Sequence, residues 1–158
     1  MEVKIIEAFI FSYFATVAFG MLFQAPKKSL PISGFIGAIG WVIFVFLRQY
    51  MEVNSFYANF IATATLSLVS ELCARAFKQP ATIFVIPGII PLVPGLGMYQ
   101  GMAQIISKSY DQGMTILLTA GSDSAAIALG VMVMTSVFRV IKISKEANLL
   151  FKGGRFCK

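Results

Sequence analysis

The strongest constraint on the fold is the run FVIPGIIPLVPGLGMY at residues 84–99, which is apolar enough to enter a bilayer and too rich in proline for a regular helix. Each proline removes a backbone donor and clashes with the preceding turn. In hydrocarbon, irregular backbone is tolerated only where it is buried in protein or lines a wet cavity. The run therefore predicts a broken helix, either a pathway element of the kind that forms substrate sites in secondary transporters or a kinked structural helix. The candidate residues of this break are Pro87, Gly88, Pro91, Pro94 and Gly95.

The rest of the chain has the composition of a membrane protein. It is 58% hydrophobic and 13% charged, whereas soluble domains are about a quarter charged. A transmembrane helix needs about 20 mostly apolar residues. The expected spans are residues 5–23, 32–47, 56–74, 81–100 and 113–138. The sequence thus predicts an all-α, polytopic membrane protein with a single transmembrane domain over residues 1–158, five transmembrane helices and a broken fourth helix.

The distribution of lysine and arginine predicts the orientation of the chain. Ten of the 13 basic residues fall in the first and third loops and in the tail 139–158, and three fall on the other side. Because positive charge is retained in the cytoplasm, we expect the N-terminus outside and the C-terminus inside. The tail is expected to be a basic cytoplasmic segment on the anionic inner leaflet. This bias accounts for the net charge of +6 without any nucleic-acid partner.

Polar residues recur along the third expected span. Asn59, Thr63, Ser67, Glu71 and Arg75 are spaced four apart and therefore share one face of a helix. Helix packing explains Thr63 and Ser67, because small hydroxyl residues pack closely and bond to their own helix. Glu71 and Arg75 are predicted to be either an interfacial ion pair or part of a functional site.

The fifth expected span contains an acid near its middle. Asp123 is flanked by Gly121, Ser122 and Ser124, and Thr119 lies on the same face. An acid at that depth costs about 2.5 to 3.5 kcal/mol on insertion scales, so it is a candidate ion site, proton relay or ligand contact. The alternative is a structural carboxyl group, hydrogen-bonded by the neighbouring serines or protonated in place. With the break, the candidate substrate and ion pathway comprises Asp123, Glu71, Arg75, Ser67, Thr63, Ser122 and Thr119.

The residue types argue against enzyme chemistry. The chain has no histidine, and Cys73 and Cys157 have no metal-binding spacing, so no Cys/His metal site and no cofactor are expected. A serine–histidine dyad is excluded for the same reason. An intramembrane aspartyl protease needs two acids in one site, and only Asp123 is deep. Phosphate-binding loop motifs are absent from the sequence, so an ATP-driven pump is not supported.

A resemblance to a known family rests on the segment ELCARAFKQPATIFVIPGIIPLVPGLGMYQGM at 71–102. It follows a lysine-bearing first loop and a second span whose Gly34, Gly37 and Gly40 are expected to permit close helix packing. Together these features resemble the threonine/serine exporter family, specifically its small five-span C-terminal-half module. The resemblance covers nearly the whole chain. In that family the small module pairs with a larger one, either fused or as a separate subunit.

The resemblance implies a function as well as a fold. It implies the small subunit of a two-component secondary exporter for threonine and serine, or for small dicarboxylates such as succinate, driven by the proton motive force. The expected partners are a larger exporter-family subunit, the small-molecule substrate, protons and the lipid of a bacterial inner or plasma membrane. A non-transporting membrane scaffold or assembly partner is the alternative, and it should tolerate Asp123→Asn. The resemblance carries over no residue-level roles, so the site residues rest on physical inference alone.

Overall fold

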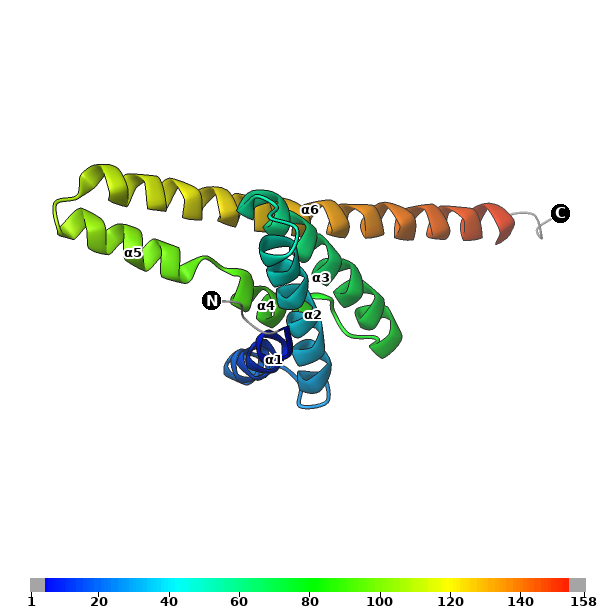
Figure 1. Ribbon diagram of the computed structural model, residues 1–158. Helices are drawn as coiled ribbons and strands as arrows, with labels where there is room; N and C mark the ends of the chain where they lie inside the picture. Colours follow the sequence, from blue (N-terminus) through cyan, green and yellow to red (C-terminus); the bar gives the residue numbers. More distant parts are fainter. Residues whose placement is uncertain (1–4, 154–158) are drawn as a thin grey trace.

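The computed structural model describes residues 5–153, with side chains described for residues 5–141. All elements in this part of the chain are helices (Figure 1). In chain order they are α1 Ile5–Leu22, α2 Leu30–Gln49, α3 Ser55–Phe77, α4 Thr82–Ile89, the 3-10 turn η1 Ile90–Leu92, α5 Gly95–Ile106 and α6 Tyr110–Gly153. The prediction of an all-α fold is confirmed.

The helices have the lengths of a multi-pass membrane protein. Four are long and apolar enough to cross a membrane, namely α1, α2, α3 and the Tyr110–Ile141 part of α6. A fifth span is formed if Thr82–Leu92 and Gly95–Ile106, which meet at a 45° bend, count as one broken helix. The predicted break in the fourth helix is thereby confirmed. The second expected span was too short, because α2 also includes Pro31, which a first turn accepts at no cost in hydrogen bonds.

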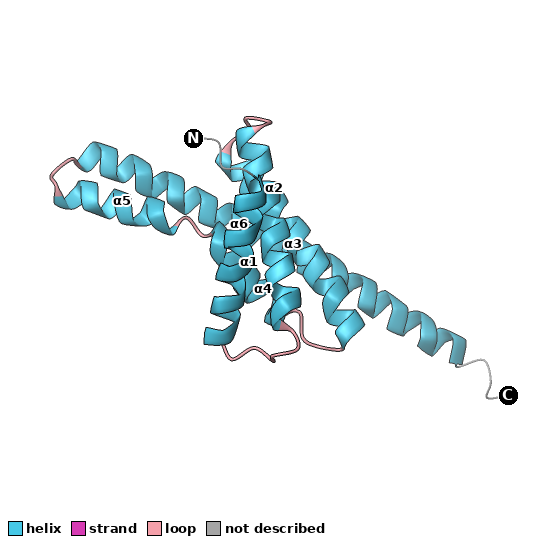
Figure 2. Ribbon diagram, turned by 60° about the horizontal axis from the view of Figure 1, so that its bottom comes forward, coloured by secondary structure: helices cyan, strands magenta, loops and turns pink. Residues whose placement is uncertain are grey.

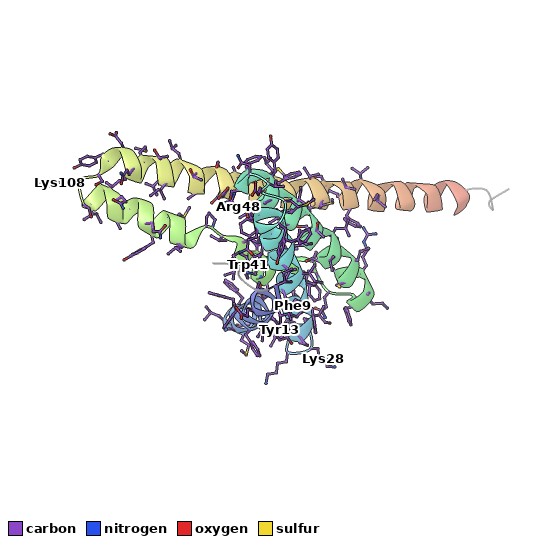
Figure 3. The ribbon with its side chains drawn as sticks, in the orientation of Figure 1. Phe9, Tyr13, Lys28, Trp41, Arg48 and Lys108 are labelled. Carbon is purple, nitrogen blue, oxygen red and sulfur yellow. The ribbon has the colours of Figure 1, made fainter. Side chains whose placement is uncertain are left out.

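Close contacts at glycine hold α2 against its neighbours. A Cβ atom on Gly34 would lie 2.7 Å from the ring of Tyr13, and one on Gly40 would lie 2.7 Å from Leu66. Gly37 sits directly against Thr16 of α1. These contacts confirm that the glycines of α2 permit close packing. Figure 3 shows the basic residues Lys28 and Arg48 near opposite ends of this helix.

The core lies where α2, α3 and α4 meet. Leu66 of α3 and Phe84 of α4 are fully buried. A Cβ atom on Gly88 of α4 would lie 3.3 Å from Leu66, so the broken helix packs directly on α3. Ile127 of α6 joins the same apolar cluster. The core therefore fixes the position of the break relative to both α3 and α6.

The long helix α6 extends beyond the bundle at both ends (Figures 1 and 2). Its 44 residues make about 66 Å of helix, whereas the sequence predicted a span over residues 113–138 only. The difference arises because neither proline nor glycine interrupts the apolar and basic residues between 131 and 152. The predicted tail is thus helical up to Gly153, and its last five residues, 154–158, lie outside the described part of the chain.

The first part of α6 forms a hairpin with α5. A Cβ atom on Gly113 would lie 2.8 Å from the carbonyl oxygen of Gly101, so the two helices touch at backbone distance. Figures 1 and 2 both show this hairpin projecting away from helices α1 to α4. We call residues 95–122 the arm. Its outward side chains are large and apolar, among them Leu96, Tyr99, Ile106, Met114 and Leu118.

Candidate functional site

Three contacts define the interface between α3 and α6, which we call the α3–α6 seam. The Ser55 hydroxyl donates to Asp123 at 2.8 Å, Thr63 lies against Gly130, and Arg75 donates to the carbonyl oxygen of Phe138 at 3.3 Å. Residue numbers rise together along both helices. The two helices therefore run parallel, as the third and fifth spans of an alternating five-span chain must.

The carboxyl group of Asp123 is buried in this seam and only half satisfied. The residue is 8% exposed; Oδ2 accepts the hydrogen bond from Ser55, and Oδ1 is buried without a partner. The neighbouring Ser122 and Ser124 donate instead to carbonyl oxygens of α6 itself. The interpretation in which those two serines hold the carboxyl group is therefore wrong. The donor is Ser55, which is distant in sequence.

Asp123 lies beside the N-terminus of α3, because Ser55 is the first residue of that helix. Asn54 caps the helix by accepting a hydrogen bond from the backbone of Phe56. The positive end of the helix dipole favours an anionic group at this position. Asp123 thus lies about a third of the way along α6 and level with the first residue of α3, a relation that the sequence of α6 alone does not reveal.

The polar face of α3 continues from Ser55 along the seam. Asn59, Thr63 and Ser67 are each at most 2% exposed. The Thr63 hydroxyl donates to the carbonyl oxygen of Asn59 in its own helix, as the packing interpretation predicts. Asn59 Oδ1 and Ser67 Oγ are buried without hydrogen-bond partners. Packing therefore explains Thr63 and leaves Asn59 and Ser67 unexplained.

Glu71 and Arg75 do not form the ion pair that was one of their two predicted roles. The guanidinium of Arg75 lies 4.8 Å from the centre of the Phe138 ring and donates to the carbonyl oxygen of that residue. Among the described side chains, Glu71 and Arg75 make no ion pair with each other. Arg75 therefore links α3 to α6, and Glu71 remains half-buried beside it.

In the broken helix, a polar residue of α2 compensates for Pro87. Pro87 has no N–H, so the carbonyl oxygen of Ile83 lacks its helical donor. The Ser33 hydroxyl of α2 lies 3.0 Å from the carbonyl oxygen of Ser29 in its own helix and 3.4 Å from that of Ile83, so its one proton is shared between the two. Both Pro87 and Gly88 are buried. The first of the freed carbonyl groups thus has a weak, shared donor within the protein, which makes the later prolines the better candidates for ligand contact.

The second half of the break is formed by η1 and its flanks. The N–H group of Val93 donates to the carbonyl oxygen of Ile90 at 3.2 Å and so replaces the donor that Pro94 lacks. Pro91 leaves the carbonyl oxygen of Pro87 without its usual donor. Pro91 is therefore the proline whose removal most directly restores a helical hydrogen bond.

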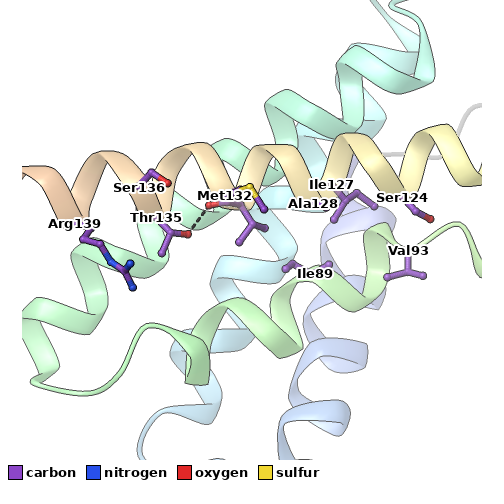
Figure 4. Close-up of a pocket in the computed structure, with 10 residues that line it drawn as sticks. Ile89, Val93, Ser124, Ile127, Ala128, Met132, Thr135, Ser136 and Arg139 are labelled. Atoms are coloured by element: carbon purple, nitrogen blue, oxygen red, sulfur yellow. Dashed lines mark hydrogen bonds between the residues drawn. The ribbon is translucent and has the colours of Figure 1, made fainter.

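A cavity of about 660 Å³ lies between the break and α6 (Figure 4). One wall is formed by Ile89 and Val93, and the other consists of residues of α6. The polar residues of the second wall are Ser124, Thr135, Ser136 and Arg139. Sequence reasoning missed this lining, although residues 124, 128, 132, 135 and 139 repeat at helical spacing and the last of them is basic.

The structure separates the predicted site residues into three groups. The seam contains Asp123, Thr63, Ser67 and Arg75, with Glu71 half-buried beside Arg75, and the break contains Pro87, Gly88, Pro91 and Pro94. Three others are exposed: Gly95 has open space around it, and the hydroxyls of Thr119 and Ser122 bond only to their own helix. Within the described residues, no three His, Cys, Asp or Glu side chains are grouped so as to hold a metal ion.

Comparison with known proteins supplies the context for this geometry. The sequence model of the family described as "Threonine/Serine exporter, ThrE" matches residues 8–137. The chain is 29% identical over 131 residues to a threonine/serine exporter of Corynebacterium glutamicum, covering 83% of this chain and 26% of that protein. It is 23% identical over 103 residues to an uncharacterized protein of Haemophilus influenzae, covering 65% of this chain and 34% of that protein. The chain thus spans between a quarter and about a third of these relatives. No solved structure matches it.

Proposed function

We propose a transport role for this chain, which belongs to the threonine/serine exporter family: it is the small subunit of a two-component secondary exporter of small hydrophilic metabolites. The substrates are threonine and serine or a small dicarboxylate such as succinate, and the proton motive force drives their export. The protein acts in a bacterial plasma membrane and is not an enzyme. The observation that carries the proposal is the buried, half-satisfied carboxyl group of Asp123 in the α3–α6 seam.

A carboxyl group in this position suits a coupled transporter. Ionisable groups within membrane segments are costly, and they occur where ions, protons or substrates pass. Asp123 has one oxygen fixed by Ser55 and one oxygen free to take a proton or to bind the ammonium group of an amino acid. A purely structural carboxyl group would be expected to have both oxygens satisfied.

The broken helix provides the second element of the proposed pathway. Its flanking cavity of about 660 Å³ falls in the size range of small-molecule sites. Arg139 is the charged residue of its lining and suits a substrate carboxylate, and the carbonyl oxygen freed by Pro91 lies in the helix that borders the cavity. Substrate contact at the break and proton binding at Asp123 would then occur on different faces of α6.

The arm supports the proposal of a larger partner. Its outward apolar residues, such as Leu96, Ile106 and Leu118, need lipid or protein around them, and the arm projects beyond the bundle rather than packing along it (Figure 2). The family relatives are three to four times longer than the matched region. We propose that the larger exporter-family subunit packs against this arm.

We further propose that the N-terminus is outside and the C-terminus is in the cytoplasm. Cysteine substitution in a variant lacking both Cys73 and Cys157 tests this orientation. Tyr50 and Asp111 are exposed in loops or helix ends of the outer side, and Lys28 is exposed on the inner side. An impermeant thiol reagent applied to intact cells should label cysteines at the first two positions and spare the third. Labelling at Lys28 alone would reverse the orientation.

The decisive experiment is efflux from proteoliposomes loaded with labelled threonine, serine or succinate. The chain is reconstituted with and without the larger family subunit from the same organism, with an imposed proton gradient. We expect efflux that requires both chains and collapses with an uncoupler. The rival is a scaffold that only assembles the larger subunit. In that case Asp123→Asn should retain full efflux, and the proposal of a coupled pathway through this chain would be wrong.

A further inference from the structure

We propose that Asp123 and Asn59 share one proton across the α3–α6 seam. The proton is bound to Oδ1 of Asp123 and donated to Oδ1 of Asn59, while Ser55 holds the other carboxyl oxygen. The inference rests on the proposed function, because it assigns the proton-binding group of the coupled exporter. It adds Asn59 and Ser55 as positioning residues for that group.

The first observation is a matched pair of unmet acceptors. Oδ1 of Asp123 and Oδ1 of Asn59 are both buried without hydrogen-bond partners, in residues that are 8% and 2% exposed. A buried polar atom left unsatisfied costs about 1 to 3 kcal/mol. A single proton on the carboxyl group turns one acceptor into a donor, and that donor can then satisfy the second acceptor.

The second observation is that both residues occupy the same part of the seam. Ser55 and Asn59 are one turn apart on the same face of α3, and Ser55 touches Asp123. One turn beyond Asn59, Thr63 lies against Gly130 of α6. Because the helices run parallel, Asn59 faces α6 between positions 123 and 130. Two residues of α6 in that interval are buried, Ala126 and Ile127. Ala126 is small and lies one turn from both Asp123 and Gly130, so the two helices come close beside Asn59.

The surroundings favour a proton over a larger cation. A metal ion or an ammonium group needs several ligands and a volume of its own. The cavity of about 660 Å³ beside the break and the cavity of about 400 Å³ at residues 111–116 both border α6, and neither is lined by Asp123 or Asn59. A proton needs no cavity. It also suits a site whose unmet atoms are both acceptors.

The other charged groups near this end of α3 are few and exposed. In the connection from α2, Arg48 donates to the carbonyl oxygen of Val53, and Glu52 is exposed. On α6 the nearest described acid is Asp111, twelve residues away or about 18 Å of helix. On α3, Glu71 is sixteen residues from Ser55, or about 24 Å. On α5, which packs on the arm part of α6, the titratable side chain is the exposed Tyr99.

The two carboxyl oxygens of Asp123 have different surroundings. Oδ2 accepts the hydrogen bond from Ser55 at the N-terminus of α3, whereas Oδ1 has no partner and is the oxygen that binds the proton. On release, the O–H bond at Oδ1 breaks, its electron pair stays on the carboxylate, and the proton passes to water.

Infrared spectroscopy of the full chain reconstituted in lipid tests the shared proton without any transport assay. We expect a protonated-carboxyl C=O band that disappears as pH rises and is missing in Asp123→Asn. In Asn59→Ala this band should move to higher frequency, because the carboxyl O–H loses its acceptor. Thr65→Val is the matched control, since its hydroxyl is on α3 and bonds only to Ile61 of the same helix. The control should leave the band unmoved.

Absence of any pH-dependent band that Asp123→Asn removes would overturn the inference, as would a band that Asn59→Ala leaves unmoved. If Asn59→Ala fails to insert, Ser55→Ala decides the case. Loss of the Ser55 donor should move the C=O band to higher frequency, because Oδ2 loses its hydrogen bond, and an unmoved band would count against the site. Coupled efflux without the band would refute the inference and keep the proposed function. The band without coupled efflux would do the reverse.

Discussion

Helix α3 packs against α2 and α6 through neighbouring faces, and the two interfaces differ in the polar groups at their closest contacts. Both use a glycine at the point of closest approach: Gly40 meets Leu66, and Gly130 meets Thr63. The α2 interface is apolar at that contact. The α6 interface has the same close packing but retains unmet acceptors at Asp123 and Asn59. Similar helix packing thus has an apolar contact in one interface, whereas the other interface keeps polar groups that can bind a proton or a ligand.

The first prediction compares the two glycines directly and carries the largest expected effect. In Gly130→Ala the new Cβ atom would lie 2.9 Å from the backbone oxygen of Phe60, so the helices must separate. In Gly40→Ala it would meet the flexible end of Leu66. Overpacking costs about 1 to 3 kcal/mol, and we expect Gly130→Ala at or above the upper end.

Thermal unfolding in detergent measures both glycine variants, and efflux measures their activity. Gly121→Ala provides the control, because a Cβ atom there meets nothing within 4 Å. If Gly40→Ala lowered the unfolding temperature more than Gly130→Ala, the α3–α6 seam would not be the tighter of the two interfaces.

The second prediction tests the chemical difference between the interfaces. Asp123→Asn preserves size and the acceptor for Ser55 while removing the charge and the titratable proton. Because an amide cannot bind the transported proton, proton-driven efflux should be lost while the thermal stability stays nearly unchanged. Asp123→Glu should retain partial efflux with an altered pH dependence. Wild-type efflux and pH profile in the Asn variant would remove Asp123 from the pathway.

The third prediction concerns the break, where the candidate ligand-binding groups are backbone carbonyl oxygens and not side chains. Pro91→Ala gives the carbonyl oxygen of Pro87 a helical donor again. Proteoliposome efflux should fall several-fold, a smaller loss than with Asp123→Asn, while membrane insertion stays normal. Pro87→Ala is the comparison variant, because the oxygen that Pro87 frees already has the shared Ser33 hydroxyl within 3.4 Å. Equal and normal efflux in both variants would make the whole break a structural kink.

Features set by local chemistry were predictable from the sequence. The break follows from Pro87, Pro91 and Pro94, which cannot donate a hydrogen bond wherever they stand, and the glycine contacts of α2 follow from the lack of a Cβ atom. The length of α6 was underestimated, because a charge-rich helix beyond residue 138 has no hydropathy signal for a span. Periodicity fixes which residues share a face and leaves open what that face meets.

The candidate site could not be predicted without knowing which helix each face contacts. The contact between Ser55 and Asp123 joins residues 68 positions apart, so only the packing of α3 on α6 reveals it. Thr119 lies one turn before Asp123 on the same face and is nevertheless exposed, because α3 begins only at the level of Asp123. Arg139 was counted only as a base of the tail, and the fold places it in the lining of the cavity.

The last prediction has the smallest expected effect and tests where the seam ends. The hydroxyls of Thr119 and Ser122 are exposed and donate only to carbonyl oxygens of α6. Surface substitutions away from such buried features usually change stability by less than about 0.5 kcal/mol, so Thr119→Val and Ser122→Ala should unfold like wild type. Efflux should also stay at the wild-type level. If either variant inserts normally and loses efflux, the pathway extends along the outer face of the arm. The arm would then contribute polar groups to the pathway at its contact with the larger subunit, and the seam would not be the only polar part of the site.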